Sequence, residues 1–204
     1  MKKIITAIFA SLILTGCATT PSGPSIEGTD FKSGLGFTSK IDTKWSVFNR
    51  NLFEENPEIF ESDIFSSVDA ETMKQLKEVI MSGQMEMFYS SVPDTEFADN
   101  INIFKIADEK IDYSNTALLC SMMPQMLSQQ LGVEVKLDKC TYEKVGNVKA
   151  FMIVFGGLVP DTTSYGYQFH TPDSTVNLTL SCRNSRCKGL EKDIEYFFDN
   201  IKFN

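Results

Sequence analysis

The second half of the sequence carries four strand patterns in succession, and this feature limits the possible folds more than any other. Residues 133–145 and 148–157 are rich in β-branched and aromatic side chains, and Gly146-Asn147 between them is typical of a hairpin turn. Two further patterns follow at residues 164–171 and 176–182. Strands joined by short connections pair antiparallel, so we expect an antiparallel sheet.

Helical patterns surround these strands. Apolar side chains recur at helical spacing over residues 70–81, after the N-cap Asp69 and before a stop at Gly83. The apolar face of a last helix is made by Leu190, Ile194, Phe197, Phe198 and Ile201. Further strands are expected at residues 36–48, as a strand pair, and at 84–92 and 101–107. This order indicates an α+β protein whose single domain, residues 36–204, is an antiparallel β-sheet covered by helices.

A helix expected at residues 115–131 is apolar over much of its circumference and ends at Gly132. Pro124 inside it removes one backbone hydrogen bond, so we expect the helix to bend or split there. We expect it to pack on the sheet through Leu118, Leu119, Met122, Met126 and Leu127.

The N-terminus has the layout of an export signal. Lys2 and Lys3 form a positive region, and residues 4–14 form an apolar run shorter than the roughly 20 residues that cross a bilayer. The segment Leu14-Thr15-Gly16-Cys17 that follows resembles the lipobox of bacterial lipoproteins. The resemblance implies that residues 1–16 are a lipoprotein signal peptide and that Cys17 becomes a lipidated N-terminus.

Residues 17–35 are expected to be the lipidated cysteine and a flexible tether, because they are rich in Pro, Ser, Gly and Thr and lack apolar periodicity. A coil of 18 residues spans roughly 25 Å. Ala18 stands where an aspartate retains enterobacterial lipoproteins at the inner membrane. The resemblance therefore implies an anchor in the cell outer membrane, on its periplasmic face, with the inner membrane as the less favoured alternative.

The charge of the chain restricts its partners. The sequence holds 19 Lys and Arg residues against 27 Asp and Glu residues, a net charge of −8. Removal of Lys2 and Lys3 with the signal leaves 17 basic residues and a net charge of −10. An acidic protein repels nucleic acid, so we expect no nucleic-acid partner and contact with the membrane through the lipid anchor.

Four cysteines remain besides Cys17, an even number that indicates disulfides in an oxidising compartment. They allow three pairings, among which the sequence alone does not choose. Only four residues separate Cys182 from Cys187 at an expected strand-to-helix turn, where a local bridge closes easily, and this leaves Cys120 for Cys140. A zinc site is the weaker alternative because no Cys-x-x-Cys pair occurs.

The order of the elements and three short segments resemble the PsbP/DcrB-like superfamily. The segments are residues 99–102, Asp-Asn-Ile-Asn, before a strand, Gly146-Asn147 at the hairpin, and Ile201-Lys202-Phe203 after the last helix. The resemblance covers about residues 36–204 and implies an α/β/α sandwich. Its members include photosystem assembly factors, a nuclear GTPase-binding protein and envelope lipoproteins, so it predicts a fold and no single function.

Motifs for catalysis and cofactors are absent from the sequence, which has no phosphate loop, dinucleotide turn, His-Glu-x-x-His or Gly-x-Ser-x-Gly. A Ser/His/Asp triad would have to use the single histidine, His170, with Asp161 or Asp173 and Ser164 or Ser174. The simpler interpretation of His170 is an ordinary residue at a strand end. We therefore expect no enzyme, no catalytic residue, no cofactor and no metal.

Residues 51–65, NLFEENPEIFESDIF, repeat phenylalanine among acidic residues. One interpretation is that these rings cap an open end of the core. The other is a partner-binding segment, formed by Phe53, Ile59, Phe60 and Phe65. Trp45 is expected to be a packing anchor.

Two functions from different classes remain open. The first is a membrane-anchored periplasmic lipoprotein that acts as a non-enzymatic interaction or assembly module with an envelope protein partner. The second is a protein that binds a lipid or small molecule in a cleft between sheet and helices, or a hydrolase using His170. The adaptable lining of such a cleft would be Met73, Met81, Met122, Met123 and Met126.

Replacement of the expected lipidation site tests the anchor. Cys17→Ser removes the thiol that would carry the acyl chains, so the variant is expected to move from the membrane fraction to the periplasmic fraction. Cell fractionation and immunoblotting measure this. Ala18→Ser is the matched control and is expected to stay in the membrane fraction; a Cys17→Ser protein that also stays there would refute the lipobox.

Overall fold

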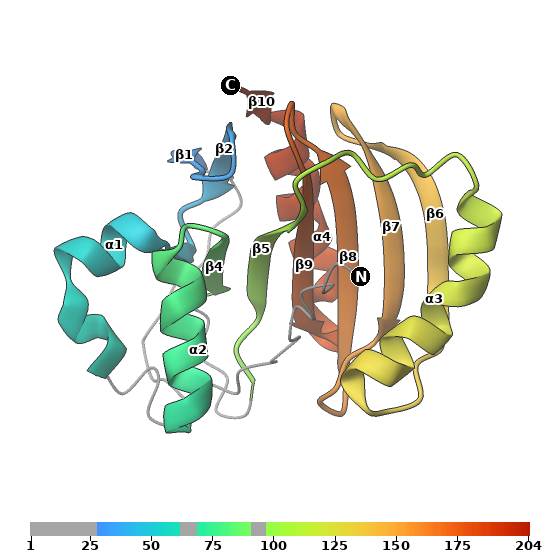
Figure 1. The fold of residues 1–204 in the computed structure, drawn as a ribbon, viewed down its shortest axis with the longest axis horizontal. Coiled ribbons are helices and arrows are strands. Elements are labelled where there is room, and N and C mark those ends of the chain that lie inside the picture. The colour runs from blue at the N-terminus through green and yellow to red at the C-terminus, as the bar shows by residue number, and fades with distance from the viewer. Residues whose placement is uncertain (1–27, 62–68, 91–96) are drawn as a thin grey trace.

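Seven strands form one antiparallel sheet in the order β3-β4-β5-β9-β8-β7-β6 (Figure 1). The structure, a computed structural model, describes residues 28–61, 69–90 and 97–204. The seven strands are β3 Trp45–Phe48, β4 Met85–Ser90, β5 Asn100–Ala107, β6 Leu137–Val145, β7 Val148–Gly156, β8 Thr162–His170 and β9 Thr175–Arg183. A smaller sheet, in the order β1-β2-β10, contains β1 Gly28–Lys32, β2 Phe37–Asp42 and β10 Lys202–Phe203.

Helices lie on both faces of the large sheet. They are α1 Arg50–Glu55, the 3-10 helix η1 Pro57–Glu61, α2 Ala70–Met81, α3 Thr116–Leu131 and α4 Asn184–Asp199. In Figure 1, α2 and α3 lie in front of opposite ends of the sheet, and α4 lies behind its central strands. The predicted α+β fold, one domain with an antiparallel sheet covered by helices, is therefore confirmed.

Strand β7 explains why residues 148–157 are apolar almost throughout. Phe151, Ile153 and Phe155 pack in the cluster under α3, whereas Met152 and Val154 face the cluster under α4. Because both faces of this strand are buried, its sequence is a near-continuous apolar run and does not alternate between apolar and polar residues.

The hairpin predicted at Gly146-Asn147 is present and touches the end of α4. Val145 pairs with Val148 across the turn, and Gly146 has a left-handed φ of 55°. A Cβ on Gly146 would lie 2.7 Å from the Phe198 carbonyl carbon, so the close approach needs glycine. The Asn147 side chain donates a hydrogen bond of 2.6 Å to the Asp199 carbonyl.

The helix boundaries follow from the predicted caps. The Asp69 carboxylate accepts hydrogen bonds from the backbone N–H groups of Glu71 and Thr72 at the start of α2. Helix α3 ends at Gly132, which has a φ of 71°. Of the two outcomes predicted at Pro124, a bend or a split, the split is wrong, because α3 continues through this residue.

The prediction of a strand pair at residues 36–48 is wrong in its pairing. Both strands exist, but β2 pairs with β1 and β10 in the small sheet, whereas β3 pairs with β4 at the edge of the large sheet. The chain changes layer at Trp45, whose side chain is 4% exposed and donates a hydrogen bond of 3.0 Å to Asp193 on α4. Trp45 is therefore a packing anchor between the sheet and α4, as predicted from the sequence.

The expected tether is too long at its C-terminal end. Residues from Gly28 onward belong to the fold, because β1 pairs with β2 and the side chains of Phe31 and Leu35 are buried. The Phe31 ring lies 5.0 Å from the ring of Phe88, which comes from a distant strand. The composition of residues 28–35 does not reveal that Phe31 packs on a distant strand. The predicted domain boundary at residue 35 is wrong for this reason.

A buried carboxylate fixes the segment after β1. Glu86 on β4 is 3% exposed and accepts hydrogen bonds from the Ser33 hydroxyl at 2.6 Å and from the Gly34 N–H at 2.8 Å. Burial raises the pKa of Glu86 above its ordinary value, although both hydrogen bonds act in the opposite direction.

None of the helices in residues 28–61, 69–90 and 97–204 has the length and apolar character needed to cross a membrane.

The raised pKa of Glu86 predicts a pH dependence of stability. Because the folded carboxyl holds its proton more tightly than the unfolded one, its contribution favours folding most at low pH and is lost as the pH rises above the ordinary value of 4.5. Glu86→Gln removes this loss. The free energy of unfolding of the variant minus that of the wild type, from urea titration, should therefore be larger at about pH 7 than at about pH 4, which means that the variant is relatively more stable at about pH 7.

The matched control is Glu78→Gln, a change of an exposed carboxylate on α2. It should show no such difference between the two pH values. A Glu86→Gln profile parallel to that of the wild type would contradict the raised pKa.

Candidate functional site

Helix α3 exposes a row of large apolar side chains, which we call the α3 stripe. Leu118, Met122 and Met126 follow one another at intervals of four residues and are 53%, 48% and 54% exposed. The neighbouring row, Leu119 with Met123 and the buried Leu127, packs instead on the sheet. The expected packing face is therefore wrong in part, because the apolar arc of α3 is wider than its contact with β6 and β7.

Helix α3 is fixed to the sheet by covalent and polar contacts. A disulfide joins Cys120 on α3 to Cys140 on β6, with their Cα atoms 5.7 Å apart. At the other end, the Val135 N–H donates a hydrogen bond of 2.8 Å to the Ser128 hydroxyl. These contacts hold the α3 stripe in one orientation.

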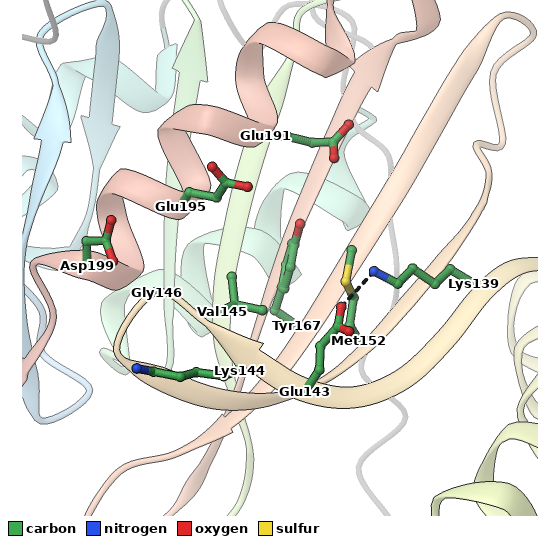
Figure 2. Close-up of a pocket in the computed structure, with 10 residues that line it drawn as sticks. All are labelled: Lys139, Glu143, Lys144, Val145, Gly146, Met152, Tyr167, Glu191, Glu195 and Asp199. Atoms are coloured by element: carbon green, nitrogen blue, oxygen red, sulfur yellow. Dashed lines mark hydrogen bonds and ion pairs between the residues drawn. The ribbon is translucent and has the colours of Figure 1, made fainter.

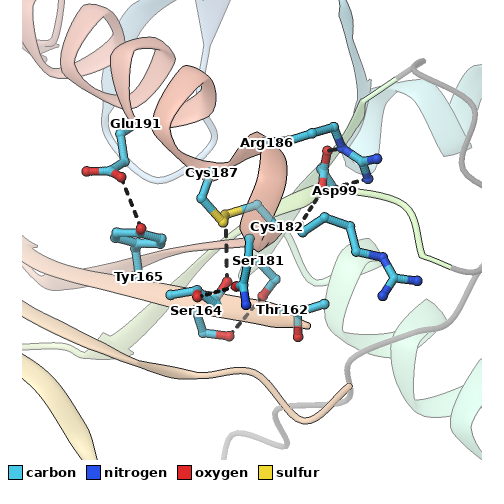
Figure 3. Close-up of a disulfide and its surroundings, with 12 residues drawn as sticks. Asp99, Thr162, Ser164, Tyr165, Ser181, Cys182, Arg186, Cys187 and Glu191 are labelled. Atoms are coloured by element: carbon cyan, nitrogen blue, oxygen red, sulfur yellow. Dashed lines mark hydrogen bonds and ion pairs between the residues drawn. A yellow bond between two sulfur atoms is a disulfide. The ribbon is translucent and has the colours of Figure 1, made fainter. Parts of the chain in front are cut away.

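The second disulfide, Cys182–Cys187, closes the turn from β9 into α4 (Figure 3). Beside it, the Asp99 carboxylate is 1% exposed and accepts hydrogen bonds from the Arg186 guanidinium at 2.5 and 3.1 Å and from the Arg183 N–H at 2.9 Å. Both predicted disulfides are thus present, and the start of α4 is anchored to the segment that leads into β5.

A cavity of about 330 Å³ lies between α4 and the β6–β7 hairpin (Figure 2). One wall is α4, with Glu191, Glu195 and Asp199, and Met152 and Tyr167 lie on strands β7 and β8. The remaining lining comes from β6 and its turn: Lys139, Glu143, Lys144, Val145 and Gly146.

The cavity has a surplus of negative charge. Its lining holds four carboxylates and two ammonium groups, and Lys139 is already paired with Glu143 at 2.6 Å. Tyr165, next to the cavity, donates a hydrogen bond of 3.0 Å to Glu191, and burial with this carboxylate raises the pKa of Tyr165 to about 12.

Tyr167 directs its hydroxyl into the cavity (Figure 2). Its side chain is 3% exposed, and its ring packs on Phe198 with the ring centroids 5.6 Å apart. Burial, followed by the negative charge of Glu191, raises the pKa of this hydroxyl well above its ordinary value, so it stays protonated. Among the residues that the structure describes, none forms a hydrogen bond with this hydroxyl, which opens onto the cavity.

The residues needed for a triad are not assembled. His170 Nδ1 is 3.2 Å from the Thr175 hydroxyl, and no hydrogen bond or ion pair joins it to Asp161 or Asp173 within the described ranges. Ser164 lies six residues away along β8, about 20 Å at the rise of a strand, and its hydroxyl contacts Ser181.

The environment of His170 also gives no reason to expect a strong base. Burial and the charge of Lys110 lower the pKa of His170, and its ring stacks on Tyr113 with the centroids 5.4 Å apart. The Ser174 hydroxyl lies 2.7 Å from that of Thr171. The described arrangement supports the interpretation of His170 as an ordinary strand-end residue.

The partner-binding interpretation of residues 51–65 is wrong for Phe53. This side chain is 1% exposed and packs with Phe48, their ring centroids 6.1 Å apart. Ile59 is partly buried against the same cluster. The side chain of Phe60 and all of Phe65 lie outside the described residues. For Phe53, the core interpretation is correct because the ring covers the end of the sheet under α1 and α2.

The methionines expected to line one cleft are spread over three places. Met73 and Met81 pack under α2, Met123 packs under α3, and Met122 and Met126 are exposed. Within the described parts of the chain, no group of three or more His, Cys, Asp or Glu side chains is arranged to hold a metal ion.

No protein-family model matches the chain, and no curated protein matches it. The solution structure of cyanobacterial PsbP (CyanoP) from Synechocystis sp. PCC 6803 is similar, with a TM-score of 0.54, 7% identity, and coverage of 91% of this chain and 98% of that chain. A crystal structure from Bacteroides thetaiotaomicron VPI-5482 has a TM-score of 0.44 and 14% identity; 87% of this chain is matched, over 49% of that chain. The fold is therefore PsbP-like, as the sequence resemblance implies.

The cavity and the α3 stripe are the candidate sites that sequence reasoning missed. The four-residue spacing of Glu191, Glu195 and Asp199 is a usable signal once a helix is predicted, but it does not identify the opposite wall. Nothing in the sequence distinguishes Tyr167 from Tyr165. For the stripe, the signal is that residues 116–131 contain no charged side chain.

Loss of the Cys120–Cys140 bridge should lower stability. The bridge closes a separation of 20 residues, so Cys120→Ala/Cys140→Ala is expected to reduce the free energy of unfolding by about 3 kcal/mol. Urea denaturation under non-reducing conditions measures this. Ser121→Ala, an exposed change on the same helix, should remain close to the wild type; equal stability of the double variant and the wild type would show that the bridge does not constrain the unfolded chain.

Proposed function

We propose that the chain is a lipid-anchored protein of the cell envelope whose folded domain is a non-enzymatic interaction or assembly module. The anchor is Cys17, and the proposed location is the periplasmic face of the outer membrane. The observation that carries the proposal is the α3 stripe, Leu118, Met122 and Met126, which is exposed on a rigid helix without any charge.

The composition of α3 fits the centre of a protein interface. Interface centres are depleted in charged residues and enriched in methionine, and α3 has no Asp, Glu, Lys or Arg in its 16 residues. Three neighbouring side chains that are each about half exposed form a contiguous apolar surface of the kind that marks interaction sites. Hydroxyl and amide side chains, Ser121, Gln125 and Gln129, provide exposed polar groups on the same helix.

The occupant that we propose is an uncharged apolar surface of another envelope protein. A helix that lies in a membrane interface carries lysine or arginine on its polar face, and α3 has neither. The acidic charge of the chain also opposes contact with anionic lipid. Both features favour a protein partner over the membrane surface.

The two disulfides support the proposed periplasmic location. Structural disulfides persist in oxidising compartments such as the periplasm, and this agrees with the export signal in residues 1–16. The positions of His170 and Ser164 agree with a non-enzymatic role, because the two residues lie at opposite ends of β8.

Small-molecule binding is the second candidate, and the cavity beside α4 favours it. Six of the ten lining residues are charged, so a polar ligand fits better than the lipid that a methionine-lined cleft would take. The two candidates use different surfaces, because α3 and α4 lie on opposite faces of the sheet (Figure 1).

Site-specific photo-crosslinking in intact cells tests the interaction module. A photoreactive residue at position 122 or 126 of the full-length protein should yield the same single partner, since both positions belong to the α3 stripe. The crosslinked peptide of that partner, identified by mass spectrometry, should be apolar and free of charge. Leu118→Asp should reduce the yield about tenfold or more, because a carboxylate would have to lose its hydration in the interface.

Position 78 on α2 is the matched control, because Glu78 is also exposed on a helix of the same face. It should not crosslink to that partner. Products with a second copy of the chain, with lipid only, or with a charged peptide would contradict the proposed occupant, and so would an undiminished yield from Leu118→Asp.

A further inference from the structure

We propose that the cavity between α4 and the β6–β7 hairpin binds a linear polyamine, a small organic cation with several ammonium groups. The site lies on the face of the sheet opposite the α3 stripe and does not depend on the proposed interaction module.

The carboxylates of α4 provide a repeating set of anionic positions. Glu191, Glu195 and Asp199 stand four residues apart, and a helix rises about 6 Å over that interval. None of the three forms an ion pair within the described residues, and Glu195 and Asp199 are exposed. A chain of methylene groups with ammonium groups at a comparable repeat can meet successive carboxylates along the helix, which a single ammonium group cannot do.

Tyr167 is the independent sign that this cavity receives a ligand. Its side chain is 3% exposed, and its hydroxyl points into the cavity and has no hydrogen-bond partner among the described residues. A phenolic oxygen can accept a hydrogen bond, and an ammonium group bound in the cavity would donate one to it. The Tyr167 oxygen thus offers a neutral acceptor next to the carboxylates.

The arrangement selects against a metal ion and against an anion. Within the described residues, no group of three or more His, Cys, Asp or Glu side chains is arranged to hold a metal ion. Four carboxylates against two ammonium groups repel an anionic ligand. A cavity of about 330 Å³ is at the lower end of the range for small-molecule sites, so it suits a slender cation.

Isothermal titration of the full-length protein in detergent with spermidine, at low and constant ionic strength, tests the proposal. We expect saturable binding of one spermidine per chain. Glu191→Gln/Glu195→Gln should weaken it at least about tenfold, because two charge-assisted contacts are lost. Tyr167→Phe should weaken it by a smaller factor, with the thermal unfolding of the free protein used to verify that the variant folds.

Glu71→Gln/Glu78→Gln is the matched control, because it removes the same charge from exposed positions on α2. It should leave the affinity unchanged. An equal loss in this control, or equal competition by magnesium at the same ionic strength, would reduce the effect to general attraction by an acidic protein and overturn the proposal. Binding of a lysine-rich peptide without binding of spermidine would overturn it in favour of a protein segment as the ligand.

Discussion

The packing of α4 across the centre of the large sheet is the constraint on which the rest of the structure depends. Near its C-terminal end, Phe197 and Phe198 are almost completely buried, and Phe197 packs against the rings of Phe31 and Phe37 from the small sheet. The Ser39 hydroxyl donates a hydrogen bond of 2.6 Å to the Phe197 carbonyl. These contacts fix the small sheet against α4.

The start of α4 is held as firmly as its end. Asp99 and the Cys182–Cys187 bridge fix the first turn, and Asp193, which is 5% exposed, receives Trp45 and Lys44 near the middle of the helix. Because α4 is fixed at its start, middle and end, its acidic side stays at a constant distance from the β6–β7 hairpin. The cavity with Tyr167 is a consequence of that fixed spacing.

The sequence predicted the parts of the fold that depend on local rules. The strands of the second half, the caps at Asp69 and Gly132, and the local Cys182–Cys187 bridge were accessible from spacing and turn chemistry, whereas Cys120–Cys140 was only the pair that remained. The errors concern residues whose partners lie far along the chain. Phe31 belongs to the core because Phe88 and Phe197 receive it, and the exposure of Met122 depends on how much of α3 the sheet can cover.

The same limit applies to the candidate sites. An acidic repeat on a helix is readable from the sequence, but a cavity needs the opposite wall, and only the antiparallel register of β7 with β8 sets Met152 beside Tyr167. The partner-binding interpretation of Phe53 failed because a pattern of aromatic and acidic residues does not tell which side of a short helix faces the core.

Strand β6 ends the large sheet, and this position has a consequence for the behaviour of the protein among its neighbours. An edge strand leaves one row of backbone groups open to pairing with a foreign strand, the first step of aggregation. Lys139, Glu143 and Lys144 place charges along β6, and the Cys140 bridge ties the strand to α3. A strand that is charged and covalently held is a poor template for strand addition.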